Sequence, residues 1–215
     1  MTAPAPINDK GSLAHLLIFA RYPELGRVKT RLAAGIGDEA ALAVYQELLH
    51  HTFTVTAEIA AHKTLWLAEP LAAPVAFPEA WNSYEQLHQL PGDLGQKMQT
   101  AFAHAFAAGT TSALIIGTDC PGLTTELLTQ AYTLLATHEV VIGPAEDGGY
   151  YLLGMRELYT DLFSNKSWST DSVLAHTLAD ADRLGLEVAQ LPTLRDVDDA
   201  NDLQAWRASS KADKA

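Results

Sequence analysis

Short apolar runs alternate along the chain with longer segments in which apolar residues recur at every third or fourth position. The run AHLLIFA at 14–20 is typical of a strand buried in a parallel sheet. Residues 37–62 then show the spacing of a long helix, which Asp38 is placed to cap. The same patterns predict further strands at 63–68, 84–91, 112–119, 139–145, 149–155 and 186–192, and further helices at 92–109, 123–138, 169–185 and 198–208.

This order of strand, crossover helix and strand predicts an α/β fold in which helices cover both faces of a mainly parallel sheet. We expect a single three-layer α/β/α domain over 13–209, preceded by a loose Pro-rich segment at 1–12 and followed by a tail at 210–215. The Pro- and Ala-rich stretch 69–82 is expected to be an irregular connection. Ligands bind such sheets beyond the carboxyl ends of the strands, so polar clusters directly after strands are the candidate sites.

Composition and charge narrow the function classes. The chain has 215 residues, enough for one well-packed domain, and 14 Lys and Arg against 26 Asp and Glu give a net charge of −12. Such a field repels polyanions, so nucleic acid and anionic membrane surfaces are not expected partners. No apolar run reaches the roughly 20 residues of a membrane helix, and the start MTAPAPINDKGS lacks the features of a secretion signal. Together with the single cysteine, this predicts a soluble cytoplasmic protein.

The first polar cluster, RYPELGRVKTRL, follows the strand at 14–20 and carries four cations: Arg21, Arg27, Lys29 and Arg31. A lysine supplies a mobile point charge and an arginine a bidentate fork, so the loop is suited to a polyphosphate. The alternative is a solvated run of charge. The loop is not a P-loop, because no GxxxxGKS or GxxxxGKT sequence follows.

Two later clusters supply carboxylates for a cation. Asp119 in GTDCPG follows a strongly apolar strand and is the first candidate ligand for a hard divalent ion, although it could instead cap the next helix. Asp196 and Asp198 in RDVDDAND would face the same way in an extended segment and supply the further carboxylates, while Asp199 or Asp198 caps the final helix. Cys120 is expected to be buried and inert. The eight histidines show no metal-ligand spacing.

Two glycine-containing segments are weaker candidates. In GPAEDGGYYLLG, Asp147 could coordinate or accept a proton, and Gly148 and Gly149 would let the backbone approach a ligand, although a tight hairpin turn explains the glycines equally well. In PGDLGQKM, Gly92 and Gly95 would allow close approach and Lys97 could bind a phosphate or carboxylate; the alternative is an ordinary helix start capped by Asp93. The residues Trp168, Ser169 and Thr170 could line an acceptor pocket or serve packing.

Taken together, six ordered blocks from about 15 to 206 resemble the bacterial glycosyltransferase-A-like transferases of the arsenosugar-biosynthesis type. The resemblance implies a Rossmann-like nucleotide-diphospho-sugar transferase fold, with Asp119 and the DVD aspartates at the metal and the KTRL loop near the phosphates. The blocks are FARYPELGRVKTRL, PGDLGQKM, IGTDCPGL, GPAEDGGYYLLG, WST and DVDDANDL.

The resemblance implies a transferase that uses an activated nucleotide donor with Mg²⁺ or Mn²⁺. We expect a glycosyltransferase that moves the sugar of a nucleotide-diphospho-sugar to a small-molecule acceptor, with Asp119, Asp147, Lys29 and Arg31 as catalytic groups. KTRL also resembles the guanylyltransferases that activate phospholactate, so nucleotidyl transfer from a nucleoside triphosphate, with release of pyrophosphate, is the rival. Neither the LxGGxxxRMG loop of sugar nucleotidyltransferases nor the D-x-D of many glycosyltransferases is present, since Gly117 stands where the first Asp would be. A non-catalytic nucleotide-binding module is the third hypothesis.

Overall fold

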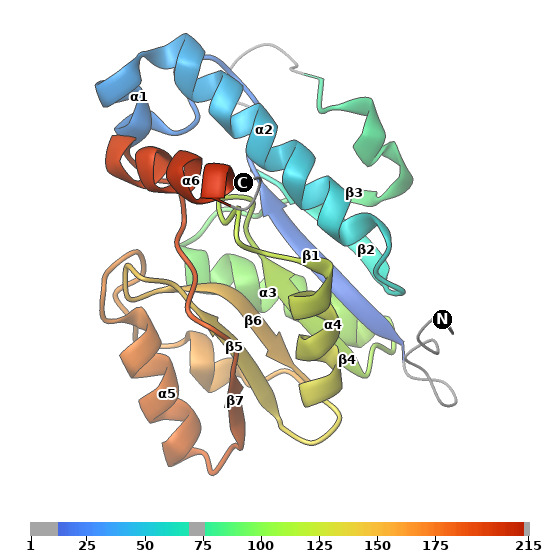
Figure 1. The fold of residues 1–215 in the computed structure, drawn as a ribbon. Helices are drawn as coiled ribbons and strands as arrows, with labels where there is room; N and C mark the ends of the chain where they lie inside the picture. The colour runs from blue at the N-terminus through green and yellow to red at the C-terminus, as the bar shows by residue number, and fades with distance from the viewer. Residues whose placement is uncertain (1–12, 69–75, 213–215) are drawn as a thin grey trace.

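The structure is a computed structural model that describes residues 13–68 and 76–212 (Figure 1). The expected loose segment at 1–12 lies outside the described residues, as do 69–75 of the expected irregular connection and the last three residues of the expected tail. In the described part of the chain, no helix is both long enough and apolar enough to cross a membrane.

A seven-stranded sheet organises the domain in the order β3-β2-β1-β4-β6-β5-β7. Neighbouring strands run parallel except at β4–β6 and β5–β6, because β6 is reversed. The prediction of a mainly parallel sheet is therefore confirmed. The strands are β1 (Ala14–Ala20), β2 (His62–Leu67), β3 (Glu85–His88), β4 (Ser112–Ile116), β5 (Val140–Pro144), β6 (Tyr150–Met155) and β7 (Val188–Gln190).

Helices cover both faces of the sheet, as a three-layer α/β/α domain requires (Figure 1). One face packs against α2 and α4 through buried residues such as Tyr45 and Leu128. The opposite face packs against α3 and α5 through residues such as Phe102 and Ala181. The helices are α1 (Thr30–Ile36), α2 (Asp38–Ala57), α3 (Leu94–Ala107), α4 (Thr125–Leu134), α5 (Val173–Arg183) and α6 (Ala200–Ala212), with short 3-10 helices η1 (Glu79–Ser83) and η2 (Thr160–Phe163).

The beginning of the helical layer differs from the sequence prediction in two ways. The KTRL segment is not wholly a loop, because α1 begins at Thr30, directly after Lys29. The prediction that Asp38 caps the long helix is wrong, because Gly37 is the N-cap of α2. Asp38 lies in the first turn, where its negative charge interacts favourably with the positive end of the helix dipole. At the other end of the chain, α6 continues through Ala212, into the segment expected to be a tail.

The order of the strands produces a switch point between β1 and β4. From β1 the chain continues to β2 and β3 on one side, and then returns to β4 on the other side of β1. The loops that leave the carboxyl ends of β1 and β4 therefore diverge, which is where open α/β sheets bind ligands. Those loops carry the cations after Ala20 and the carboxylate of Asp119.

Candidate functional site

A pocket of about 690 Å³ lies at this switch point, a volume within the range of small-molecule sites. Its walls come from the loops after β1 and β4, the start of α3, strand β6 and the segment before α6. Segments that are far apart in the sequence thus meet at one edge of the sheet. The pocket is lined by eight of the predicted site residues: Arg21, Arg27, Lys29, Arg31, Lys97, Asp119, Asp196 and Asp198.

Lys29 is the cation at the centre of the site. Its Nζ lies 2.6 Å from Asp119 Oδ1 and 3.2 Å from Asp198 Oδ1, and its side chain is only 5% exposed. The residue is the N-cap of α1 and has a left-handed backbone, with φ 50 and ψ 44. A lysine gains nothing locally from that conformation, so the surrounding structure holds it there, as is common at functional sites.

Asp198 receives a second cation from the surface. Arg31 Nη2 lies 2.5 Å from Asp198 Oδ2, while Lys29 contacts the other carboxylate oxygen. Asp198 does not cap α6, because Asp199 does: Asp199 Oδ1 accepts from the amide of Asp202, whose own Oδ2 accepts from the amide of Asp199. The capping role predicted for Asp199 or Asp198 thus belongs to Asp199, and Asp198 is free to face the cations.

Asp196 lies in the same wall of the pocket and has a raised pKa. Burial raises its pKa to about 7, and the charges of Asp119, Asp198 and Asp147 add to that shift while Lys29 opposes it. The loop is fixed to the neighbouring one by the amide of Val197, which donates to the carbonyl oxygen of Asp119 at 2.9 Å. The raised pKa of Asp196 therefore reflects its burial first and the nearby carboxylates second.

The glycine pair in GPAEDGG forms a hairpin turn, the alternative reading of that segment. β5 and β6 are antiparallel, the amide of Ala145 donates to the carbonyl of Gly149, and Gly148 has φ 86. Asp147 Oδ1 accepts from the amide of Gly149 at 2.9 Å. None of Asp147, Gly148 and Gly149 lines the pocket, although the charge of Asp147 reaches Asp196.

The PGDLGQKM segment is divided between helix capping and the pocket. Asp93 caps α3 in a reciprocal capping box with Gln96, which is the alternative that the sequence left open. Gly95 provides room for Trp168, whose ring atoms would lie 2.4 Å from a Cβ at that position. Gly92 and Gly95 do not line the pocket, whereas Lys97 does.

One pocket-lining residue, Tyr45, was not found from the sequence as a ligand or a support. The hydroxyl of Tyr45 on α2 accepts from the amide of Arg21 at 2.8 Å and donates to its carbonyl at 2.9 Å, so it fixes the start of the cation loop. Burial is the main cause of the raised pKa of Tyr45, so the hydroxyl keeps its proton. Of Trp168, Ser169 and Thr170, for which the sequence left a pocket or a packing role open, Ser169 lines the pocket. A buried helix aromatic carries no signal of such a contact in one sequence. Cys120 is buried, as predicted, and burial raises the pKa of its thiol.

The donor set fits a hard divalent cation. Carboxylate oxygens are the ligands that Mg²⁺ and Mn²⁺ prefer, and Asp119, Asp196 and Asp198 supply them at one wall of the pocket. In this structure Lys29 Nζ lies between the carboxylates of Asp119 and Asp198. Among the residues that the structure describes, three ligand atoms come within 4.8 Å of one another at His15, His62 and Glu85, and not at the three aspartates. The histidines show no metal-ligand spacing along the sequence, but the fold brings His15 and His62 together with Glu85.

Solved structures of other proteins share this fold. At 32% identity, a protein from Desulfovibrio desulfuricans G20 assigned as a nucleotide-diphospho-sugar transferase matches with a TM-score of 0.82 over 90% of this chain and 85% of its own. CMP:2-keto-3-deoxy-manno-octonic acid synthetase complexed with CTP matches at 11% identity with a TM-score of 0.57, covering 94% of this chain and 100% of its own. Glucosyl-3-phosphoglycerate synthase from Mycobacterium tuberculosis, in complex with Mn²⁺ and UDP, matches at 11% with a TM-score of 0.52, covering 90% and 77%.

These likenesses establish a nucleotide-diphospho-sugar transferase fold. No curated protein matches the chain. The family model that does match covers residues 51–170, more than half of the sequence, and includes Asp119, Asp147 and both hairpin glycines. The chain therefore belongs to the family described as uncharacterized proteins conserved in bacteria, DUF2064.

Proposed function

We propose that this protein is a metal-dependent glycosyltransferase that transfers the sugar of a nucleotide-diphospho-sugar to a hydroxyl of a small molecule. One observation carries the proposal: the buried ammonium of Lys29 joins Asp119 to Asp198 at the wall of the pocket between β1 and β4. Such a cation–carboxylate pair is suited to a diphosphate held through a divalent ion. The 32% identical relative, assigned as a nucleotide-diphospho-sugar transferase, supports the same donor class.

The cations of the first loop act on the leaving group. When the glycosidic bond to the donor breaks, a nucleoside diphosphate departs and negative charge grows on its β-phosphate. Lys29 and Arg31 are placed to stabilise that charge, and Arg21 and Arg27 line the same pocket. A divalent ion held by Asp119, Asp198 and Asp196 would supply Lewis-acid neutralisation of the diphosphate.

The acceptor side is assigned to the hairpin between β5 and β6. Asp147 is the candidate base for the acceptor hydroxyl. Asp147 does not line the pocket, but it is near enough for its charge to raise the pKa of Asp196, which does. A base is needed when the acceptor hydroxyl attacks the anomeric carbon of the donor sugar, because the hydroxyl must lose its proton; it is not needed when an acceptor phosphate attacks the α-phosphorus of a nucleotide. The resemblance to arsenosugar-biosynthesis-type glycosyltransferases also favours transfer to a hydroxyl.

A donor screen tests the proposal. Purified protein is incubated with Mn²⁺ and, in parallel, with nucleotide sugars and with nucleoside triphosphates, and the small product is identified by mass spectrometry. We expect release of a nucleoside diphosphate from a nucleotide sugar, because slow hydrolysis of the donor needs no knowledge of the acceptor. Asp119→Asn should abolish the release. Asp182→Asn, an exposed carboxylate on α5, is the matched control and should leave it unchanged.

Two results would count against glycosyl transfer. Pyrophosphate released from a triphosphate, and lost in Asp119→Asn, would replace the proposal with nucleotidyl transfer. Tight nucleotide binding without turnover of any donor would indicate the non-catalytic module instead.

A further inference from the structure

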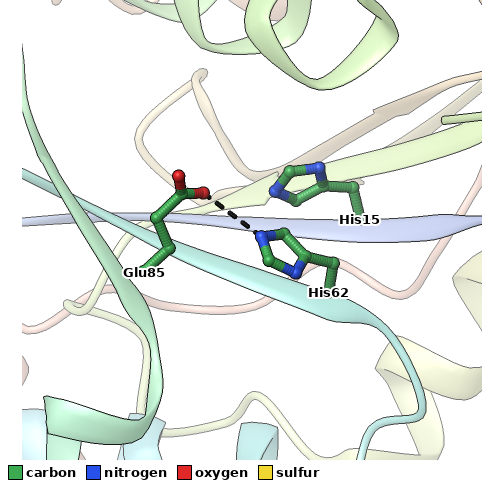
Figure 2. Close-up of side chains that lie close together, drawn as sticks. All are labelled: His15, His62 and Glu85. Carbon is green, nitrogen blue, oxygen red and sulfur yellow. Dashed lines mark hydrogen bonds and ion pairs between the residues drawn. The ribbon is translucent and has the colours of Figure 1, made fainter. Parts of the chain in front are cut away.

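A second cluster of metal-ligating side chains lies at the opposite edge of the sheet from the pocket. His15, His62 and Glu85 stand at the amino ends of the neighbouring strands β1, β2 and β3, and their side chains meet on one face (Figure 2). From His15 to the pocket-lining Ala20, β1 advances by roughly 16 Å at about 3.3 Å per residue. The cluster is therefore separate from the aspartates of the proposed donor site.

Strand register brings the three residues together. His15 and His62 are paired in the parallel register of β1 and β2, with ring centroids 4.7 Å apart. Glu85 pairs with Thr64, two residues beyond His62 and on the same face of the sheet. Each of the three residues offers a ligand atom, and these atoms all lie within 4.8 Å of one another. Helix α3, on that face, adds His104.

One separation in the cluster is close to that of two ligands in a tetrahedral metal site. Ligands about 2.0–2.1 Å from a tetrahedral zinc ion lie about 3.3–3.4 Å from one another. His62 Nε2 lies 3.2 Å from Glu85 Oε2, and His104 Nε2 lies 3.8 Å from the same oxygen. The first separation is close to that of two zinc ligands, whereas His104 lies outside the group of three whose ligand atoms all come within 4.8 Å of one another and would have to move toward it. The side chains of His62 and His104 are exposed enough to make such movements, at 62% and 41%.

Hydrogen bonds hold the carboxylate of Glu85 beside the histidines. Thr64 Oγ1 donates to Glu85 Oε2 at 2.7 Å, and the same oxygen lies 3.2 Å from His62 Nε2. The carboxylate is thus already turned toward the position that a metal ion would take.

Two threonines are placed to hydrogen-bond the proposed ligands and so to orient them. Thr64 Oγ1 lies 2.7 Å from His15 Nε2, and Thr110 Oγ1 lies 3.4 Å from His15 Nδ1. When His15 Nε2 takes a metal, its proton moves to Nδ1, where the Thr110 hydroxyl can accept it. Thr64 keeps its hydrogen bond to Glu85 and so continues to orient that carboxylate.

We propose that His15, His62 and Glu85 form a structural Zn²⁺ site at the amino edge of the sheet, and that the exposed side chain of His104 moves toward them to become the fourth ligand. Imidazole with one carboxylate selects a borderline transition ion over Mg²⁺ or Ca²⁺. The ion links three adjacent strands to α3. It holds in place β3, a four-residue strand at the edge of the sheet.

Zinc binding to untagged protein tests the proposal. The protein is stripped with a chelator and titrated with ZnCl₂ by calorimetry, and Co²⁺ is used in parallel because tetrahedral coordination gives it a visible absorption band. His62→Ala and Glu85→Gln are the test variants, since both side chains are partly exposed and the fold does not depend on their burial. His50→Ala, an exposed histidine on α2, is the matched control. Asp119→Asn reports on metal bound at the pocket.

We expect this site to bind one zinc ion per chain, and to keep that binding in Asp119→Asn and in His50→Ala. Bound zinc should raise the melting temperature. His62→Ala and Glu85→Gln should each weaken its binding at least tenfold and remove the thermal shift. The proposal is overturned if wild-type protein binds no zinc, if both test variants bind it as tightly as wild type, or if Asp119→Asn alone abolishes binding.

Discussion

Lys29 reaches Asp119 from a left-handed backbone: its Nζ lies 2.6 Å from Asp119 Oδ1, while its φ is 50. The side chain is nearly buried and directed at two carboxylates. An ion pair that is held against local backbone preference at the mouth of a pocket indicates a role in ligand chemistry. Lys29 is therefore the position at which a substitution should affect turnover most.

We expect Lys29→Met to reduce release of nucleoside diphosphate from the donor by about 100-fold or more, because a cation that stabilises the leaving group is lost. The reduction is measured as the ratio of the initial rates of nucleoside diphosphate release by wild type and variant, at saturating donor and Mn²⁺. Lys29→Gly should lose as much activity, yet be more stable to urea than Lys29→Met, because glycine adopts positive φ freely. A rate within threefold of wild type in both variants would refute the catalytic role of the ammonium.

The pH dependence of stability should report Asp196. Its folded pKa, about 7, lies above the usual value of 3.8, so between these pH values the folded state binds the proton more tightly than the unfolded state. In metal-free protein, this contribution to stability is present at pH 4 and is lost as the pH rises through 7.

Asp196→Asn lacks this titration, so the variant should gain stability relative to wild type between pH 4.5 and pH 8. Melting temperatures measured in EDTA across that range give the difference, with about 2–4 °C for each kcal/mol. Adding Mn²⁺ at pH 8 should stabilise wild type more than the variant. Parallel melting curves across the whole range would show that Asp196 ionises normally.

The hairpin turn should tolerate no side chain at Gly148. Its φ is 86, and a Cβ there would lie 2.1 Å from the carbonyl oxygen of Asp171. Gly109, with φ 87, has open space around the same position and so serves as the control for backbone strain alone. We expect Gly109→Ala to cost about 1 kcal/mol and Gly148→Ala clearly more, measured by urea denaturation. Equal losses would mean that the turn moves away from Asp171 at little cost.

Tyr45→Phe should destabilise the start of the cation loop. It leaves the amide and carbonyl of Arg21 without the hydroxyl they share, at a cost of about 1–3 kcal/mol. The KM for the donor should rise, because Arg21 lines the pocket. Tyr84→Phe removes a comparable buried hydroxyl, bonded to Thr56 away from the pocket, and should leave KM unchanged. A KM that changes equally in both variants would remove the link between Tyr45 and the pocket.

Most of the sheet could be predicted because its strands are apolar runs buried on both faces. β1 was predicted with its observed bounds, and β4 from an apolar run that ends at polar loop residues. The reversal of β6 was left open, since a glycine pair serves a ligand loop and a hairpin equally well. Helix α1 was missed because its N-cap is Lys29, which gives no capping signal, and because seven residues are too few for a clear period.

The candidate site was predicted in part for the same physical reason. Charged residues that directly follow parallel strands must meet at one edge, so Lys29, Asp119 and Asp198 could be grouped without coordinates. Contacts from a helix face, such as the hydroxyl of Tyr45 on Arg21, depend on side-chain direction that no short pattern records. The histidine cluster depends on register between strands, which spacing along the chain does not contain.

The two outer strands of the sheet are both short: β3 has four residues and β7 has three. A sheet ends in unpaired backbone groups, which can recruit a strand from another molecule and start aggregation. Brief edges offer few such groups, and Glu85 adds a charge to one of them. The carboxylate that β3 contributes to the histidine cluster thus also helps its edge to resist strand-to-strand polymerisation, and a cation bound to Glu85 would offset part of that protective charge.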